Sequence, residues 1–246
     1  MALTFPKDGN WVVWPHFSSG PGLINGQDAS ARYAAVRGIS HQVTSNSFTV
    51  SGVLERHKGA VQQAFFFTSL PSDVTVYIER LRRQKDFPLH SRETGLIGLE
   101  YEFGKNEHTL FGQQGVLTTL GMGGDRPCVV ELPTDWLNIS DRIGYVVRRH
   151  PATANVMRFH DEIAGVGRVP KLEEWLSLIG EKDPGAANFD SDWGCVVTFA
   201  NQTKAQTARE AGKVQFSVVG DTAVCRIGDQ EIQANLSFSP NLPEGR

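Results

Sequence analysis

Apolar and polar positions alternate along much of this chain, and the clearest example spans residues 60–82. Its first half runs into three consecutive phenylalanines, and a Pro-Ser-Asp turn follows. The second half alternates strictly, with valines and an isoleucine on one face and Thr75, Tyr77 and Glu79 on the other. A continuous apolar strand beside an alternating one is typical of a sheet that is packed on one face and wet on the other. The pattern therefore predicts a hairpin whose Thr75, Tyr77 and Glu79 face solvent.

Similar short apolar runs recur at intervals of about ten residues, separated by glycine, proline and aspartate clusters. They predict strands over 35–44, 47–55, 60–69, 74–82, 96–103, 108–113, 116–120, 128–132, 143–149 and 156–160. A further strand over 10–17 is broken by Pro15. Short strands at this spacing favour an all-β class, a sandwich or barrel, over alternating strand–helix units.

Two short helices are expected to interrupt the strands. In 169–180, apolar residues recur at helical spacing. In 203–211, Thr203 can serve as N-cap, Gln206 as its capping-box partner and Gly212 as the C-terminal stop. The Gly-Asp turns that follow predict a meander of three strands over 214–218, 222–227 and 231–236. We expect one β-sandwich domain over 1–238 and a flexible tail over 239–246.

Composition narrows the classes of protein that fit. The chain has 246 residues, 40% of them apolar and 21% charged, with a net charge of −3. The slightly acidic balance argues against a nucleic-acid partner. No apolar stretch approaches the roughly 20 residues of a membrane helix, and the N-terminus lacks the regions of a signal peptide. These features predict no membrane partner, and either a cytoplasmic protein or a mature or excised piece of a secreted one.

The three cysteines, Cys128, Cys195 and Cys225, are too few and too scattered for a disulfide scaffold or a zinc site. Cys195 and Cys225 lie in apolar strand contexts, where a buried thiol behaves as a small hydrophobic side chain. One disulfide with an odd cysteine left over is the alternative.

Three stretches resemble the β-sandwich domains of polysaccharide lyases. Residues 64–82 (AFFFTSLPSDVTVYIERLR) resemble an aromatic strand and the strand after it. Residues 136–147 (WLNISDRIGYVV) resemble a Trp-Leu-Asn segment before a Gly-Tyr strand, and 192–211 (DWGCVVTFANQTKAQTAREA) a closing strand, turn and short helix. The resemblance implies a large antiparallel supersandwich similar to the galactose-mutarotase fold, as in heparinase II/III-like and chondroitin or hyaluronate lyase-like enzymes.

In that family most catalytic residues lie on an α/α-toroid domain that precedes the sandwich, and the sequence contains no such helical domain. No catalytic residue can therefore be carried over. The resemblance implies the non-catalytic, carbohydrate-facing half of an extracellular or periplasmic enzyme, or a stand-alone relative of it. A catalytic α/α-toroid domain in a longer parent protein is the partner that it implies.

Tryptophans beside polar residues are the candidates for sugar contact, because sugar rings stack on exposed indoles while neighbouring polar groups bond the hydroxyls. The candidate carbohydrate-binding residues are Trp136, Asn138, Asp141 and Arg142, and then Trp14 and His16. The alternative is that these tryptophans are core residues with a satisfied N–H.

The residues also allow an enzyme in its own right. A lyase needs a base and an acid, for which the candidates are His57 or His160 and Tyr101 or Tyr145. Arg142 or Arg148 could then neutralise a uronate carboxylate. No two histidines have metal-ligand spacing, so no cofactor is predicted apart from a candidate calcium site at Asp190 and Asp192. Turn chemistry is the alternative for this aspartate pair.

The leading interpretation is a non-catalytic β-sandwich domain of a polysaccharide-degrading enzyme, which binds a polysaccharide or oligosaccharide or supports a catalytic cleft. The alternatives are a stand-alone lyase or hydrolase acting on an acidic glycan, and a structural or oligomerisation module whose exposed aromatics serve a protein interface.

Overall fold

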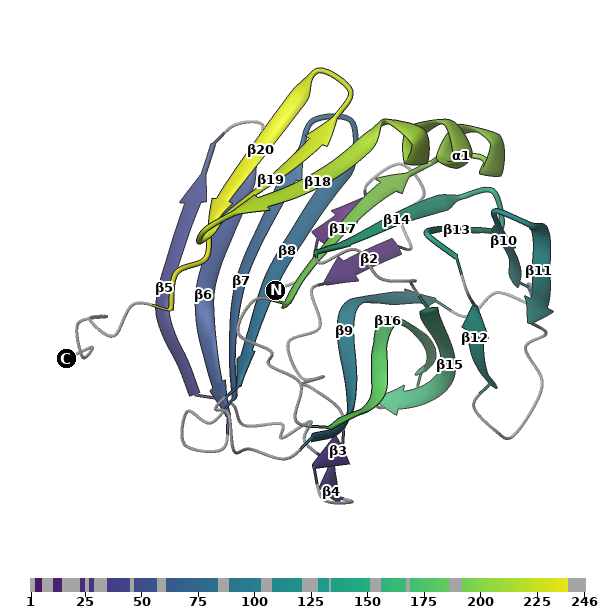
Figure 1. The fold of residues 1–246 in the computed structure, drawn as a ribbon. Coiled ribbons are helices and arrows are strands. Elements are labelled where there is room, and N and C mark those ends of the chain that lie inside the picture. The colour runs from purple at the N-terminus through teal and green to yellow at the C-terminus, as the bar shows by residue number, and fades with distance from the viewer. Residues whose placement is uncertain are drawn as a thin grey trace.

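The fold is antiparallel β-structure arranged in four sheets (Figure 1). The structure is a computed structural model that describes residues 3–5, 11–14, 23–24, 27–28, 35–44, 47–56, 61–83, 89–102, 108–120, 128–132, 134–150, 156–166, 169–185 and 192–238. Antiparallel pairing throughout, with one helix among these residues, makes this an all-β sandwich of the predicted class.

The largest sheet has nine strands. In spatial order they are β11 (Gly115–Leu120), β10 (His108–Gly112), β13 (Trp136–Ile139), β14 (Ile143–His150), β17 (Asp192–Ala200), β8 (Val74–Arg83), β7 (Val61–Leu70), β6 (Phe48–Arg56) and β5 (Ala35–Val43). Strands adjacent in sequence are mostly adjacent in space, and β17 is the exception because it enters between β14 and β8. The strand that leads into the helix, β17, is therefore an inner strand that joins the two halves of the sheet.

A second sheet has six strands, and two smaller sheets complete the described fold. The six are β1 (Leu3–Phe5), β2 (Trp11–Trp14), β9 (Leu89–Glu102), β16 (Val169–Gly185), β15 (Val156–Val166) and β12 (Cys128–Leu132). The smaller sheets are the pair β3 (Leu23–Ile24) with β4 (Gln27–Asp28), and a meander of β18 (Val214–Val219), β19 (Thr222–Ile227) and β20 (Gln230–Asn235).

All the strands predicted from the apolar pattern form, with ends that shift by a few residues at most except in β9 and β15. Both of these are longer than predicted, since β9 begins at Leu89 and β15 extends to Val166. The tail over 239–246, like His16, His57 and Asp190, lies outside the described residues. The single-domain boundary stays a prediction. Within the part of the chain that the structure describes, no helix is long and apolar enough to cross a membrane.

The predicted helix over 169–180 is wrong. This segment belongs to β16, which pairs with β15 on one side and β9 on the other. Part of its apolar set also fits a strand, because Leu172, Leu176 and Leu178 stand an even number of positions apart, whereas Trp175 and Ile179 do not share that spacing. Pairing with strands that are distant in sequence determines that this segment is a strand, and the local spacing of apolar residues contains no information about those strands.

The second predicted helix forms as α1 (Lys204–Lys213). Thr203 is the N-cap, and it makes the capping box with Gln206 that the sequence predicts. Gly212 is not the stop, because the helix runs on through Lys213 and Val214 leaves it in an extended conformation. Strand β18 of the meander begins at Val214, directly after the helix, so the helix ends without a glycine in the left-handed conformation.

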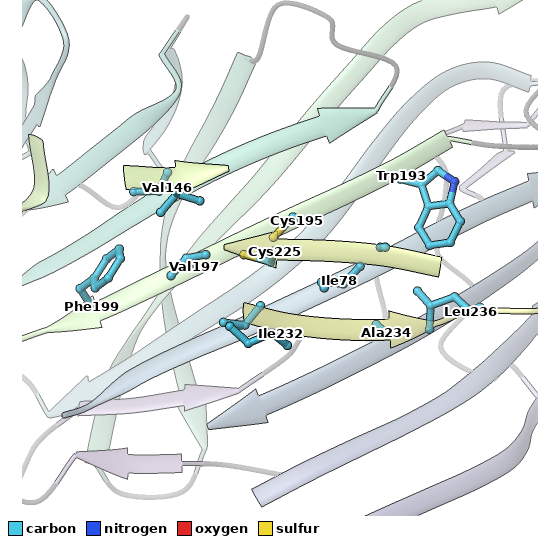
Figure 2. Close-up of a cluster of buried hydrophobic side chains, with 14 of the residues drawn as sticks. Ile78, Val146, Trp193, Cys195, Val197, Phe199, Cys225, Ile232, Ala234 and Leu236 are labelled. Carbon is cyan, nitrogen blue, oxygen red and sulfur yellow. The ribbon is translucent and has the colours of Figure 1, made fainter. Parts of the chain in front are cut away.

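One apolar cluster of the core lies between the meander with α1 and one face of the nine-stranded sheet (Figure 2). Strands β8, β14 and β17 supply Val76, Ile78, Val146, Cys195, Val197 and Phe199 from the sheet side. The meander supplies Ala223, Cys225, Ile232 and Ala234 from the other side. We call this covered face of the nine-stranded sheet the meander face and the opposite one the far face.

The far face is buried as well, which corrects the predicted wet face of the hairpin. Thr75, Tyr77 and Glu79 are only 1%, 1% and 2% exposed. Phe65 and Phe67, on the neighbouring strand, are 3% and 0% exposed on the same face. Polar residues at alternate positions here satisfy one another inside the protein instead of meeting water.

Candidate functional site

Backbone strain concentrates at one end of the nine-stranded sheet. Three turns meet there, since Phe199 pairs with Val74 and Ala200 with Ile143. We call the turns 71–73, 140–142 and 201–203 the rim. Every non-glycine residue with a positive φ among the described residues lies on it: Ser72, Asp73, Ser140, Asp141 and Asn201, with φ between 52° and 66°. Such conformations cost energy and cluster at functional sites, which makes the rim a candidate site.

The turn after β13 is held from beneath by Asn138. The Asn138 side chain is fully buried, and its Oδ1 accepts a hydrogen bond from Asp141 N at 2.9 Å. Its Nδ2 donates to Gln202 O at 2.9 Å and to Thr207 Oγ1 at 2.8 Å. The Asn138 amide makes all of these bonds inside the protein. Its contribution to the rim is to position Asp141.

Two exposed residues project from this turn beside the start of α1. Asp141 Oδ1 accepts a hydrogen bond from Lys204 N at 2.6 Å, a position where a helix favours negative charge. Gln202 N donates to Arg142 O at 3.0 Å, which ties the turn to the β17–α1 connection. Among the described residues the Arg142 guanidinium has no hydrogen-bond or ion-pair partner. Arg142 is therefore a solvent-exposed cation on a backbone that hydrogen bonds hold in place.

The other predicted sugar-binding residues do not join this turn. Trp136 is half-buried and packs against the core under the meander, at the opposite end of β13 from the turn. Trp14 lies in β2 of the six-stranded sheet, opposite Gly98. The sugar-binding role of Trp136, Asn138, Asp141, Arg142, Trp14 and His16 stays a prediction.

A second cluster of polar groups lies on the far face, inside the protein. Tyr77 Oη donates to Glu79 Oε2 at 3.1 Å, and the hydroxyls of Thr75 and Thr198 are hydrogen-bonded to each other across the strands. Tyr145 lies opposite Thr198 and is fully buried. The candidate acid Tyr145 thus belongs to a buried row of hydroxyl and charged groups.

The row ends in two buried charged residues, Glu79 and Arg149. Arg149 lies opposite Gly194, and Gly194 lies opposite Glu79 on the next strand. A Cβ on Gly194 would lie 3.4 Å from Glu79 Cγ and Oε1, an ordinary van der Waals distance, so Gly194 lies directly against the Glu79 side chain. Burial lowers the pKa of the Arg149 guanidinium below its usual value, and the negative charge of Glu79 opposes that shift. A buried charged pair is costly to maintain, which marks the row as a second candidate site.

The remaining catalytic candidates are spread over different sheets. Tyr145 is in the nine-stranded sheet, whereas His160 and Tyr101 are in β15 and β9 of the six-stranded sheet. Along β16, which lies between these two strands, the residues opposite His160 and Tyr101 are Trp175 and Leu172, three positions apart. Register therefore does not place His160 beside Tyr101.

No metal site emerges from the residues that the structure describes, where no group of three or more His, Cys, Asp or Glu could hold an ion. Asp192 is the first residue of β17, opposite Leu81. The calcium prediction at Asp190 and Asp192 stays a prediction.

The sequence missed one cluster that fixes the meander to the sheet. The Arg80 guanidinium stacks on Trp193 and on Phe238, each at 5.0 Å from the ring centroid. Its Nη1 also donates to Asp221 Oδ1 at 2.5 Å and to Leu236 O at 3.0 Å. The Arg80 partners are far away in sequence, and a basic run at a strand end gives no signal for them.

Comparison with known proteins gives structural similarity without a family. Neither a protein family nor a curated protein matches the chain. Among solved structures it is similar to a heparinase III (9% identity, TM-score 0.46), covering 87% of this chain and 29% of that one. It is also similar to a heparan sulfate lyase of Pedobacter heparinus (7%, TM-score 0.46, 90% and 30%) and to an α-N-acetylgalactosaminidase of Bifidobacterium bifidum (11%, TM-score 0.48, 85% and 38%).

These similar proteins are polysaccharide lyases and a glycosidase, and the chain spans about a third of their length. At such identities and TM-scores, the similarity is no argument for a shared function.

Proposed function

We propose that this chain is a carbohydrate-facing, non-catalytic β-sandwich domain of a polysaccharide-degrading enzyme, and that it meets glycan at the rim. The observation that carries the proposal is the fixed turn 140–142, which exposes Asp141 and Arg142. Carboxylate and guanidinium groups are the hydrogen-bonding partners that sugar hydroxyls need, and a preformed backbone reduces the entropy lost on binding. A catalytic α/α-toroid domain in a longer parent protein would be the partner of this sandwich.

Burial of the candidate acid and of the charged pair supports a non-catalytic role. Tyr145, Tyr77 and Glu79 are at most 2% exposed, and Glu79 accepts its hydrogen bond from Tyr77. A general acid must come within hydrogen-bond reach of the substrate. Side chains so deeply enclosed serve the packing of the sandwich.

The second candidate function is a stand-alone lyase or hydrolase acting on an acidic glycan. The observation that favours it is the far-face row, where Tyr77 and Glu79 of β8 and Tyr145 and Arg149 of β14 lie on one face, on either side of β17. Perturbed charged groups collected in one place are typical of active sites as well as of structural networks.

A binding screen and an activity assay on the same purified chain distinguish the two functions. We expect glycan binding without formation of unsaturated uronate product, measured by absorbance across anionic polysaccharides. In Arg142→Ala, loss of one charged hydrogen bond should weaken binding about tenfold. Arg209→Ala, which changes an exposed arginine of α1, should leave binding unchanged. Product formation by the wild-type chain would overturn the non-catalytic role, and failure to bind any glycan would overturn the proposal itself.

A further inference from the structure

Two cysteines meet across the core. Cys195 lies in β17, on the meander face of the nine-stranded sheet, and Cys225 lies in β19, the central strand of the meander. Both are 0% exposed, and both are free thiols. Figure 2 shows their sulfur atoms on the facing sides of the two strands. They come from opposite layers of the core and are 30 positions apart in sequence (225 − 195).

Small side chains around the pair allow the layers to approach closely. The buried neighbours of Cys225 on the inner side of the meander include Ala223 and Ala234, and α1 contributes Ala211. Cys195 and Cys225 belong to the same buried cluster, so the two thiols share one environment that excludes water. Sandwich folds accommodate a disulfide between facing sheets at such positions.

We propose that Cys195 and Cys225 form an intramolecular disulfide that cross-links the meander to the nine-stranded sheet when the chain meets a thiol–disulfide oxidant such as oxidised glutathione. One cysteine thiolate attacks the glutathione disulfide, which gives a mixed disulfide and releases one glutathione. The second thiolate attacks the protein-bound sulfur and releases the other glutathione. The two cysteine sulfurs are oxidised, and the two glutathione molecules formed carry away the two protons.

Burial makes this reaction slow in the folded protein. Burial raises the pKa of the Cys195 thiol well above its usual range, and the contact with Cys225 raises it further. The thiol is the less reactive form, and at 0% exposure neither sulfur is accessible to glutathione. Oxidation therefore proceeds during folding, or when the meander opens, and is slow afterwards.

The proposal goes beyond glycan binding and is tested without a glycan. Cys128→Ser leaves the pair as the only two cysteines of the chain. This variant is refolded from denaturant in a glutathione redox buffer, and free thiols are then counted after denaturation. We expect the count to fall from two to zero, with an intact mass lower by two hydrogens and a cross-linked peptide containing Cys195 and Cys225. The oxidised chain should melt at a temperature higher by on the order of 5 °C than after reduction.

Two comparisons make the result decisive. The same treatment of the natively folded, reduced variant should give the disulfide much more slowly than refolding does. Cys128→Ser with Cys225→Ser cannot form an intramolecular disulfide, so the fraction that keeps its single thiol free should melt at the same temperature with and without reductant. Two free thiols, or two glutathione adducts, after oxidative refolding of the Cys128→Ser variant would overturn the proposal. A disulfide between Cys128 and either partner in the unmutated chain would also overturn it.

Discussion

At the scale of single residues, Gly144 and Gly212 differ in the space that surrounds them: a side chain would fit at Gly212 and would not fit at Gly144. A Cβ on Gly144 would overlap the buried Thr207 side chain, whose Oγ1 it would contact and whose Cγ2 it would approach to 2.7 Å. Thr207 cannot withdraw, because Asn138 Nδ2 donates to its Oγ1, which in turn donates to Thr203 O. By contrast, a Cβ on Gly212 would meet nothing within 4 Å.

We therefore expect Gly144→Ala to lower the free energy of unfolding by about 1–3 kcal/mol, the usual cost of overpacking. Gly212→Ala should raise it by up to about 1 kcal/mol, because alanine is the better helix former. Urea unfolding followed by tryptophan fluorescence measures both. Equal effects of the two substitutions would mean that β14 and α1 are not in this close contact.

At the scale of elements, Arg80 connects β8 to the meander and to the chain after it. Arg80→Met removes the ion pair with Asp221, the bond to Leu236 O and the stacking on Trp193 and Phe238. We expect a loss of about 2 kcal/mol in unfolding free energy and faster amide hydrogen exchange in β19 and β20. Arg82→Met is the matched control, since Arg82 is exposed and its guanidinium lies farther from the Phe238 ring, at 5.8 Å. Unchanged exchange in β20 of Arg80→Met would contradict this role.

Elements with local signals could be predicted from sequence, and those decided by distant partners could not. The capping box of Thr203 and the Gly-Asp turns of the meander depend on residues within a few positions, so their patterns are explicit. The strand identity of 169–180 depends on β9 and β15 instead. At the candidate sites, Asp141 and Arg142 could be singled out because turns are local. The link from Asn138 to Thr207 spans 69 positions and has no sequence signature.

At the scale of the whole molecule, burial of both faces of β8, in the middle of the nine-stranded sheet, explains why its alternating pattern gave a wrong prediction. Alternation of apolar and polar residues predicts solvent exposure of the polar ones only where one face of the sheet is solvated. Here β8 is covered on both faces. Its polar side chains therefore need partners within the protein: Thr75 bonds Thr198 on the next strand, and Tyr77 donates to Glu79. The far-face row consists of polar and charged side chains that become buried because both faces of an alternating strand are covered. Their burial is unfavourable unless each finds a partner.

That cost is measurable at Glu79 and Arg149. Glu79→Gln leaves the buried Arg149 without its counter-charge, and removing one partner of a buried pair costs about 3–5 kcal/mol. Glu79→Gln combined with Arg149→Met removes both charges, so it should recover much of that loss. Glu210→Gln, which breaks an exposed pair with Lys213 at 2.8 Å, should change stability by less than about 1 kcal/mol. Chemical denaturation of wild type, of the single variants Glu79→Gln and Arg149→Met, and of the double variant gives the coupling energy. A coupling near zero would mean that Glu79 and Arg149 are solvated separately and that the far face is open to water.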